Sequence, residues 1–166
     1  MRMFVSLGSN VDPQQNLGRA IAELRRRFPV AATSSVYRTT PVGDPDQPDF
    51  WNLAAELECD LAPDEVQRQL RTIENLLGRR RDPQRPYGPR TVDLDLVLVP
   101  GLVGRFGTLE LPSPLVEREA FVAVPLAEIA PDVMHPVLLT PLKGLARAAA
   151  ERSSPPPKAL AVELTS

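Results

Sequence analysis

The order of periodic segments along the chain constrains its fold more than any other feature of the sequence. Apolar and polar residues alternate over 50–59 and 91–99, the pattern of strands with one buried face. Two other segments repeat apolar residues every three or four positions, as amphipathic helices do, and Asp12 followed by Pro13 is expected to cap the first of them. The expected elements are 3–7 (strand), 13–27 (helix), 30–37 (strand), 50–59 (strand), 62–77 (helix) and 91–99 (strand).

This succession of strand, helix, strand, strand, helix, strand is the split βαβ pattern of ferredoxin-like folds. The predicted fold class is therefore α+β, a sandwich of an antiparallel sheet with helices packed on it. Glycines at 101, 104 and 107 predict a small hairpin, and 117–129 and 141–151 predict helices near the C-terminus.

A single domain over residues 1–152 is expected, because 166 residues are too few for two well-cored domains. A Ser-Ser-Pro-Pro-Pro break opens residues 153–166. We expect this segment to form a tail whose last nine residues are poorly ordered.

Composition and charge exclude several classes of protein. The one cysteine, Cys59, can form neither an internal disulfide nor a cysteine-based zinc site. A net charge of −2 argues against a general nucleic-acid binder, since such proteins neutralise phosphates with a basic surface. The sequence also lacks a signal-peptide pattern and any apolar run of about 18 residues. We expect a cytoplasmic protein without nucleic-acid or membrane partners, and a monomer.

Two loops concentrate the prolines, of which the chain has 19. Three prolines lie over 41–48 and three over 83–89. Because proline fixes φ and lowers the entropy of an open loop, both loops are expected to be stiff. The second loop belongs to an arginine cluster that spans residues 79–90, where five arginines face one acidic residue, Asp82.

Asp93 and Asp95 follow the arginine cluster at once, on the strongest strand of the chain. Residues two apart on a strand project from the same face, so the two carboxylates form a pair. Such a pair suits Mg²⁺, which binds one or two carboxylates and fills its other positions with water and phosphate. The alternative is a solvent-facing strand with two ordinary surface acids.

Arginines beside a carboxylate pair are typical of sites that hold a polyphosphate. The sequence has no Gly-x-x-x-x-Gly-Lys-Ser/Thr loop, no kinase glycine-rich loop and no His-Arg-Asp segment. Any nucleotide must therefore be bound in another way.

Six segments, in this order, resemble the 6-hydroxymethyl-7,8-dihydropterin pyrophosphokinase family, whose members transfer pyrophosphate from ATP to a pterin alcohol in folate biosynthesis. The Gly-Pro-Arg-Thr-x-Asp-Leu-Asp segment is the most specific. The six are Leu7–Asn10, Ser35–Thr39, Asp46–Asn52, Ile73–Arg79, Gly88–Asp95 and Val124–Pro131.

The resemblance implies a role for each matching residue. Asp93 and Asp95 would hold two Mg²⁺ ions, and Arg79 and Arg90 would contact the phosphates during attack on the β-phosphorus. The implied pterin contacts are Thr39, Pro41, Val42, Phe50, Asn52 and Phe121, with the two phenylalanines sandwiching the ring. The implied ATP contacts are Glu74, Arg79, Arg81, Tyr87, Arg90, Ser113 and Arg118.

The chain departs from the family pattern on the ATP side. Ser113 and Glu119 occupy places where the family usually has a histidine and an arginine, and Arg118 lies one residue early. Tyr87 replaces a usual tryptophan, and the arginine loop is one residue longer, which leaves the role of Arg85 open. These changes keep open a noncatalytic paralogue that binds nucleotide or pterin.

Some of these residue types also fit a different class of protein or a purely structural role. A ferredoxin-like RNA-binding module would need a basic sheet with exposed aromatic residues. Phe50 and Phe121 could be core residues, and Glu74 could form a surface ion pair. His135, the one histidine, is expected to be structural.

Overall fold

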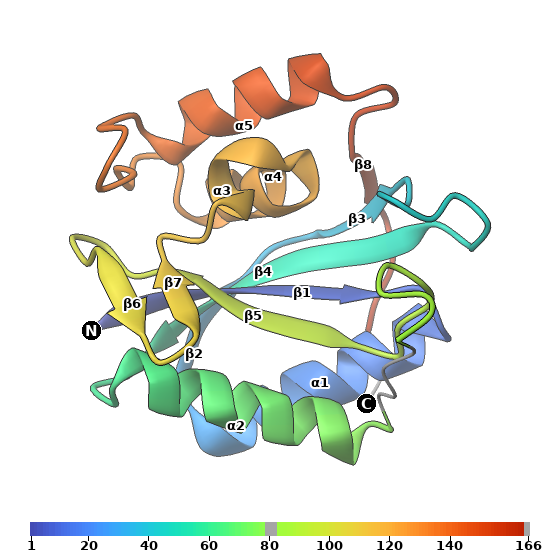
Figure 1. Ribbon diagram of the computed structural model, residues 1–166, viewed down its shortest axis with the longest axis horizontal. Coiled ribbons are helices and arrows are strands. Elements are labelled where there is room, and N and C mark those ends of the chain that lie inside the picture. Colours follow the sequence, from blue (N-terminus) through green and yellow to red (C-terminus); the bar gives the residue numbers. More distant parts are fainter. Residues whose placement is uncertain (79–82, 165–166) are drawn as a thin grey trace.

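A computed structural model describes residues 1–78 and 83–164, which fold around one antiparallel sheet (Figure 1). Its strands follow the order β5-β1-β4-β3-β8, and β2 also pairs with β4. This arrangement confirms the predicted α+β class. The strands of the sheet are β1 (Arg2–Ser9), β2 (Val30–Thr33), β3 (Val36–Thr39), β4 (Phe50–Glu58), β5 (Asp93–Leu98) and β8 (Lys158–Leu160).

Helices α1 (Pro13–Arg27) and α2 (Pro63–Leu76) cover one face of the sheet (Figure 1). Both helices begin at a proline, which has no N–H to leave unpaired in the first turn. Their apolar stripes pack on alternate residues of the strands and form the larger core, which includes Leu17, Leu70 and Leu94.

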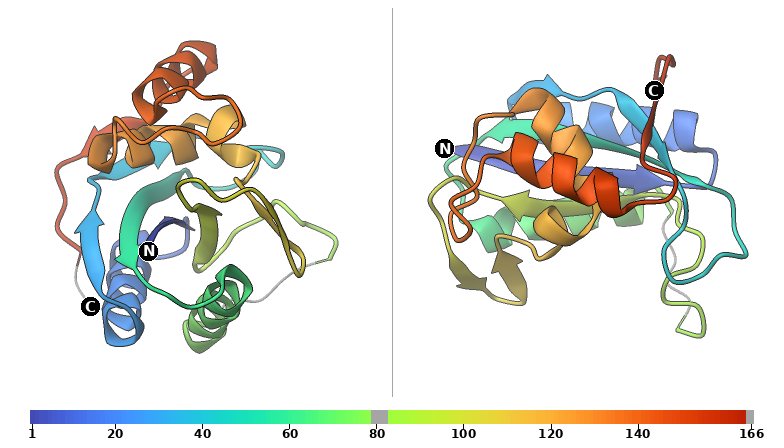
Figure 2. Two further views of the ribbon diagram at one scale, coloured as in Figure 1. Left: turned by 90° about the vertical axis from the view of Figure 1, so that its left-hand side faces the viewer. Right: turned by 90° about the horizontal axis from the view of Figure 1, so that it is seen from above.

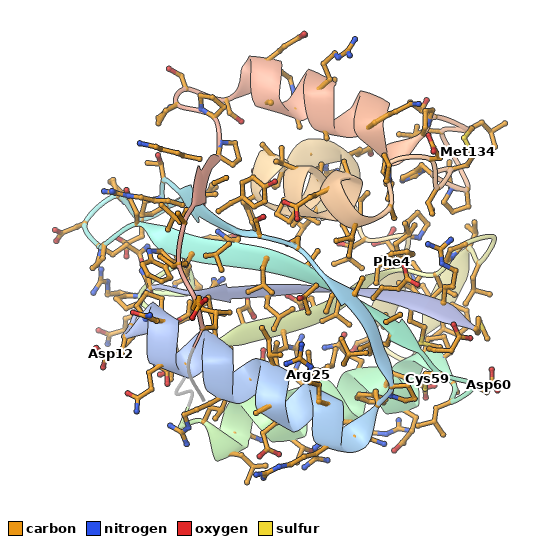
Figure 3. The ribbon with its side chains drawn as sticks, turned by 180° about the vertical axis from the view of Figure 1, so that it is seen from behind. Phe4, Asp12, Arg25, Cys59, Asp60 and Met134 are labelled. Carbon is orange, nitrogen blue, oxygen red and sulfur yellow. The ribbon has the colours of Figure 1, made fainter. Side chains whose placement is uncertain are left out.

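Helices α3 (Leu115–Arg118), α4 (Ala120–Ile129) and α5 (Leu142–Arg152) lie on the other face, with α5 outermost (Figures 1 and 2). Phe4 of β1 belongs to the core beneath α4, whereas Arg25 lies on α1 across the sheet (Figure 3). None of the helices in the described ranges is long and apolar enough to cross a membrane.

Strand β5 shows the predicted alternation. Leu94 and Leu96 are buried in the core, while Asp93 and Asp95 lie on the opposite face and are partly exposed. The predicted hairpin is also present, as β6 (Gly104–Phe106) paired with β7 (Leu109–Leu111).

The segment predicted as one strand over 30–37 forms two strands, β2 and β3. Between them, the Ser34 hydroxyl accepts the backbone N–H of Ala54 (2.9 Å) and the Ser34 N–H donates to the Ala54 carbonyl (2.8 Å). A side chain that bonds to the backbone competes with the strand ladder, so the ladder is interrupted here.

The prediction that Asp12 caps the first helix is right about its position but wrong about its hydrogen bond. Asp12 stands at the N-cap position of α1, but its backbone is left-handed (φ 41°) and its side chain makes no capping hydrogen bond. The Asp12 carbonyl instead accepts the N–H of Asn16 at 3.0 Å.

The prediction that the last nine residues are poorly ordered is wrong for β8. This strand pairs with β3 and extends the sheet. Leu160 and Leu164 also pack against the larger core, which accounts for the order of the segment. The limits of the domain, 1–152, stay a prediction.

Candidate active site

Two rows of paired residues cross the sheet on the face that carries α4. In the antiparallel register, Gly8 of β1 is paired with Asn52 of β4 on one side and with Asp93 of β5 on the other. Ser6 of β1 is likewise paired with Asp95 of β5. Because alternate residues of a strand share a face, these pairings gather an amide and two carboxylates on one surface, with a glycine between them.

A cavity of about 680 Å³ lies over these rows; we call it the main cavity. Its walls come from β1, β3, β4 and β5, from the two proline-containing loops, and from helices α2, α3 and α4. The residues predicted from the sequence that line it are Thr39, Val42, Phe50, Asn52, Tyr87, Arg90, Asp93, Asp95 and Phe121. Residues assigned to pterin and to phosphate thus share one space.

The end of the main cavity formed by β3 and β4 is neutral. Asn52 is only 3% exposed, and its Nδ2 donates a hydrogen bond to Thr39 Oγ1 at 2.5 Å. A Cβ atom at Gly8 would lie 2.7 Å from Asn52 Oδ1, closer than any ordinary contact. Glycine at position 8 is therefore what leaves room for the amide.

The end formed by β5 is charged. Arg90 Nη1 donates to Asp93 Oδ2 (3.1 Å), and Arg71 Nη2 of helix α2 donates to Asp95 Oδ1 (2.9 Å). Arg71 Nη1 also donates to Oε2 of Glu74 (2.8 Å), a carboxylate that is 2% exposed. Each aspartate of β5 is thus paired with an arginine.

The carboxylate pair fits a divalent cation held jointly with phosphate. Burial, and then the neighbouring Asp93, raise the pKa of Asp95 to about 6 against the opposing effect of Arg71. A carboxylate whose ionised form is disfavoured in this way gains from an added cation. Among the described residues no group of three or more acidic, histidine or cysteine side chains could hold a metal, so Mg²⁺ here would take its other ligands from phosphate and water.

A second cavity, of about 410 Å³, adjoins the main cavity. Both are lined by Arg71, Asp95 and Leu115, which therefore form the boundary between them. Ser113 lines the second cavity, whereas Glu119 lines the main one.

The two proline-containing loops contact each other beside the main cavity (Figures 1 and 2). Gln47 Nε2 donates to the Tyr87 carbonyl (2.6 Å). Arg85, whose role the sequence left open, pairs with Asp44 through Nε (2.9 Å) and donates from Nη2 to the Asp46 carbonyl (3.1 Å). The pKa of the Asp44 carboxyl is lowered, chiefly by its hydrogen bond from Arg85.

Asn10 connects both loops to the end of β1. It is 5% exposed; its Oδ1 accepts the Arg90 N–H (2.8 Å), and its Nδ2 donates to Gln47 Oε1 (2.8 Å) and the Pro48 carbonyl (3.0 Å). No role was predicted for it from the sequence, although an asparagine directly after a buried strand is the kind of signal that could have found it.

Several predicted site residues lie elsewhere. Neither cavity is lined by Pro41, Glu74 or Arg118. Glu74 still reaches the site indirectly, through Arg71, whereas Arg118 is exposed on α3. Arg79 and Arg81 are outside the described residues. Arg71 and Gly8, like Asn10, were not predicted from the sequence.

Comparison with known proteins gives a family match over most of the chain. Residues 4–131 match the family described as 7,8-dihydro-6-hydroxymethylpterin-pyrophosphokinase (HPPK). The chain is 40% identical over 133 residues to the Bacillus subtilis protein named 2-amino-4-hydroxy-6-hydroxymethyldihydropteridine pyrophosphokinase, covering 78% of each chain. It is 42% identical over 135 residues to the Synechocystis protein of the same name, covering 80% of this chain and 68% of that one.

Longer proteins also match part of their length. The chain is 33% identical over 137 residues to a folic acid synthesis protein of Dictyostelium discoideum, covering 82% of this chain but only 20% of that protein. Its fold is similar to the crystal structure of Plasmodium falciparum HPPK-DHPS with pteroate, with a TM-score of 0.71, 11% identity, and coverage of 91% of this chain and 44% of that one. Such low identity shows a shared fold alone.

The antiparallel sheet, the carboxylate pair on β5 and the sequence match lead to the same conclusion. The chain belongs to the 7,8-dihydro-6-hydroxymethylpterin-pyrophosphokinase family.

Proposed function

We propose that this protein transfers pyrophosphate from ATP to the hydroxymethyl group of 6-hydroxymethyl-7,8-dihydropterin, a step of folate biosynthesis. The hydroxyl oxygen forms a bond to the β-phosphorus and gives up its proton, which is released to solvent. The bond from that phosphorus to the oxygen shared with the α-phosphorus breaks, and AMP leaves with the electron pair. The products are the pterin diphosphate and AMP.

One observation carries the proposal: a member of this family has a neutral amide pocket and a carboxylate pair in the same cavity. Asn52 and Asp93 are both paired with Gly8, so they are two strands apart. A substrate with a polar ring at one end and a reacting hydroxyl at the other fits this arrangement.

The neutral end would bind the pterin. Asn52 and Thr39 offer donor and acceptor groups to the polar edge of the ring, and Phe50 and Phe121 offer aromatic faces. Val42, which lines the main cavity, would add contacts from the first proline-containing loop. Pro41 lines neither cavity and is proposed to add a contact through the backbone of the same loop. Because Asn52 is already held by Thr39, little order is lost when the ring binds.

The charged end would hold the triphosphate. Two Mg²⁺ ions bound by Asp93 and Asp95 would neutralise the phosphates and align them for in-line attack. Arg90, whose side chain is fixed by Asp93 and by the Pro86 carbonyl (2.9 Å), would donate to phosphate oxygens. Positioning and neutralisation of charge are the main contributions that a protein makes to phosphoryl transfer.

ATP contacts are proposed for Arg79, Arg81, Tyr87, Arg90, Ser113 and Arg118, and an indirect role for Glu74. Ser113 is well placed to donate to a nucleotide in the second cavity, which it lines. Glu74 would act through Arg71 rather than by touching ATP.

A noncatalytic paralogue is not favoured, because the Bacillus subtilis and Synechocystis relatives are named as pyrophosphokinases and the chain keeps Arg90, Asp93 and Asp95. The monomeric state and cytoplasmic location stay predictions.

The test is a direct assay with purified protein, ATP, Mg²⁺ and the hydroxymethyl pterin. AMP and pterin diphosphate should form in equal amounts, and omission of the pterin or chelation of Mg²⁺ should stop their formation. If no AMP forms at saturating substrates, the proposed function is wrong.

A further inference from the structure

Arg71 is a charged residue of the site whose contacts differ from those of an ordinary surface arginine. Arg68, one turn earlier on α2, pairs with Asp64 and Glu65 of its own helix. Arg71 instead reaches across to β5, lines both cavities, and keeps 38% of its side chain exposed. Its guanidinium therefore stands at the boundary that a nucleotide spanning both cavities would cross.

The two terminal nitrogens of Arg71 have different partners. Nη1 donates to Glu74 Oε2 (2.8 Å) and to the Leu94 carbonyl (3.1 Å). Glu74 is itself held, because its Oε2 accepts the Leu94 N–H at 2.8 Å. Nη2 donates to Asp95, whose side chain is 32% exposed. One nitrogen is thus anchored to the buried framework, while the other contacts a carboxylate at the cavity surface.

This contact conflicts with the binding of a cation by Asp95. Asp95 Oδ1, which accepts from Arg71, is one of two oxygens available to a metal ion. A metal ion so close to a guanidinium would be repelled by it. A nucleotide would bring phosphate oxygens to the same place, and these are good partners for arginine.

We propose that Arg71 is a phosphate-binding residue that exchanges partners. Without nucleotide, Nη2 neutralises Asp95. When Asp95 takes up Mg²⁺ with ATP, Nη2 transfers to a phosphate oxygen while Nη1 stays on Glu74. Arg71 would thereby supply a cation on the side where Ser113 and Glu119 stand in the usual places of a histidine and an arginine.

The proposal rests on the proposed function, and nucleotide binding tests it without turnover. The probe is an ATP analogue with a methylene group between the α- and β-phosphorus, bound with Mg²⁺ and followed by calorimetry. Arg71→Gln should weaken its binding about 10- to 100-fold, the size of a charge-assisted hydrogen bond. The affinity of the variant for AMP, which lacks the transferred phosphates, should fall less than about threefold.

The same substitution should have the opposite effect on the binding of a metal ion in the absence of nucleotide. Mn²⁺, followed by its electron paramagnetic resonance signal, should bind Arg71→Gln several times more tightly than the wild type, because Asp95 has lost its competing cation. Damage to the fold would weaken the binding of both ligands. Partner exchange should instead weaken the binding of the ATP analogue and strengthen the binding of Mn²⁺.

Two further variants separate charge from structure. Arg71→Lys keeps the positive charge and should recover part of the affinity for the ATP analogue. Arg26→Gln removes an exposed arginine of α1 that pairs with Glu23, outside both cavities, and should change neither affinity.

The outcomes are distinct. Equal affinity of wild type and Arg71→Gln for the analogue, or weaker Mn²⁺ binding by the variant, overturns partner exchange and leaves the proposed function intact. Failure of the wild type to bind the analogue overturns both.

Discussion

The two ends of the main cavity are organised by different interactions. At the neutral end, Asn52 is buried and held by one hydrogen bond to Thr39, and both partners are uncharged. At the charged end, Asp93 and Asp95 are partly exposed and paired with arginines.

The difference shows how one surface can serve two binding tasks. The neutral end is shaped before its ligand arrives, so its affinity depends on fit and on hydrogen bonds. At the charged end each carboxylate is already neutralised by an arginine, so a ligand must replace existing ion pairs. Variants at the two ends should therefore separate pterin binding from phosphate transfer.

The largest effect is expected from Asp95→Asn. Asparagine can still accept the hydrogen bond from Arg71, so the fold should persist, but it is a poor ligand for Mg²⁺. We expect kcat to fall at least about 10³-fold, measured as AMP release. Pterin affinity, measured by calorimetry, should change less than about threefold. Retained turnover would remove the assignment of Asp95 as a metal ligand.

Asn52→Leu should produce the complementary result. Removal of buried hydrogen-bonding groups costs about 1–3 kcal/mol each, so pterin affinity should fall about 10- to 100-fold while affinity for the ATP analogue stays the same. Asn16→Leu is a matched control, because Asn16 is also buried (6% exposed) but lies on α1. A similar loss of pterin affinity in the control would show that general destabilisation is the cause.

Gly8→Ala tests whether the two ends are independent. Its Cβ would displace the Asn52 amide, because the ideal position is 2.7 Å from Oδ1. Such overpacking should lower the free energy of unfolding by about 1–3 kcal/mol, measured by urea denaturation. Pterin affinity should fall severalfold, and more than affinity for the ATP analogue. Equal losses for the two ligands would mean that the ends are coupled through β1.

The smallest effect on the site is expected from His135, which lies outside both cavities. Its Nδ1 accepts the N–H groups of Val137 (3.3 Å) and Leu138 (3.0 Å), which confirms a structural role. Burial lowers the pKa of His135 below 6.5, against the opposing effect of Glu117.

Below that pH the unfolded chain therefore binds more protons than the native protein, and the free energy of unfolding falls as the pH drops. His135→Gln should flatten this part of the stability curve, measured by urea denaturation from pH 7 to 5, without changing pterin or nucleotide affinity. An unchanged curve would show that His135 does not contribute to acid sensitivity.

The sequence was most informative where structure is determined locally. The alternation over β5 predicted both the buried leucines and the common face of Asp93 and Asp95, because strand geometry alone decides which residues share a face. The helix bounds 13–27 were predicted for a similar reason, from apolar spacing and Pro13.

Contacts between distant segments were not predictable in this way. Strand β8 is ordered because it pairs with β3, more than a hundred residues earlier in the chain. Three residues are too few to contain a sequence pattern that predicts this pairing. Arg71 follows the buried stripe residue Leu70, and the sequence does not reveal whether its guanidinium stays on the helix surface or reaches β5. The resemblance to a family supplied the pterin residues; without it, Phe50 and Phe121 would have been assigned to the core.

The pairing of Asn52, Gly8 and Asp93 across three strands restricts the length of the substrates that the site can accept. Neighbouring strands are about 4.8 Å apart, so the backbones that carry the amide and the first carboxylate are separated by roughly 10 Å, and the glycine between them adds no bulk. A molecule anchored at Asn52 can present its hydroxyl to the phosphates only if its own length matches this fixed interval. Selectivity between pterins with shorter and longer side chains would then be set chiefly by the hydrogen-bonded spacing of the backbone strands.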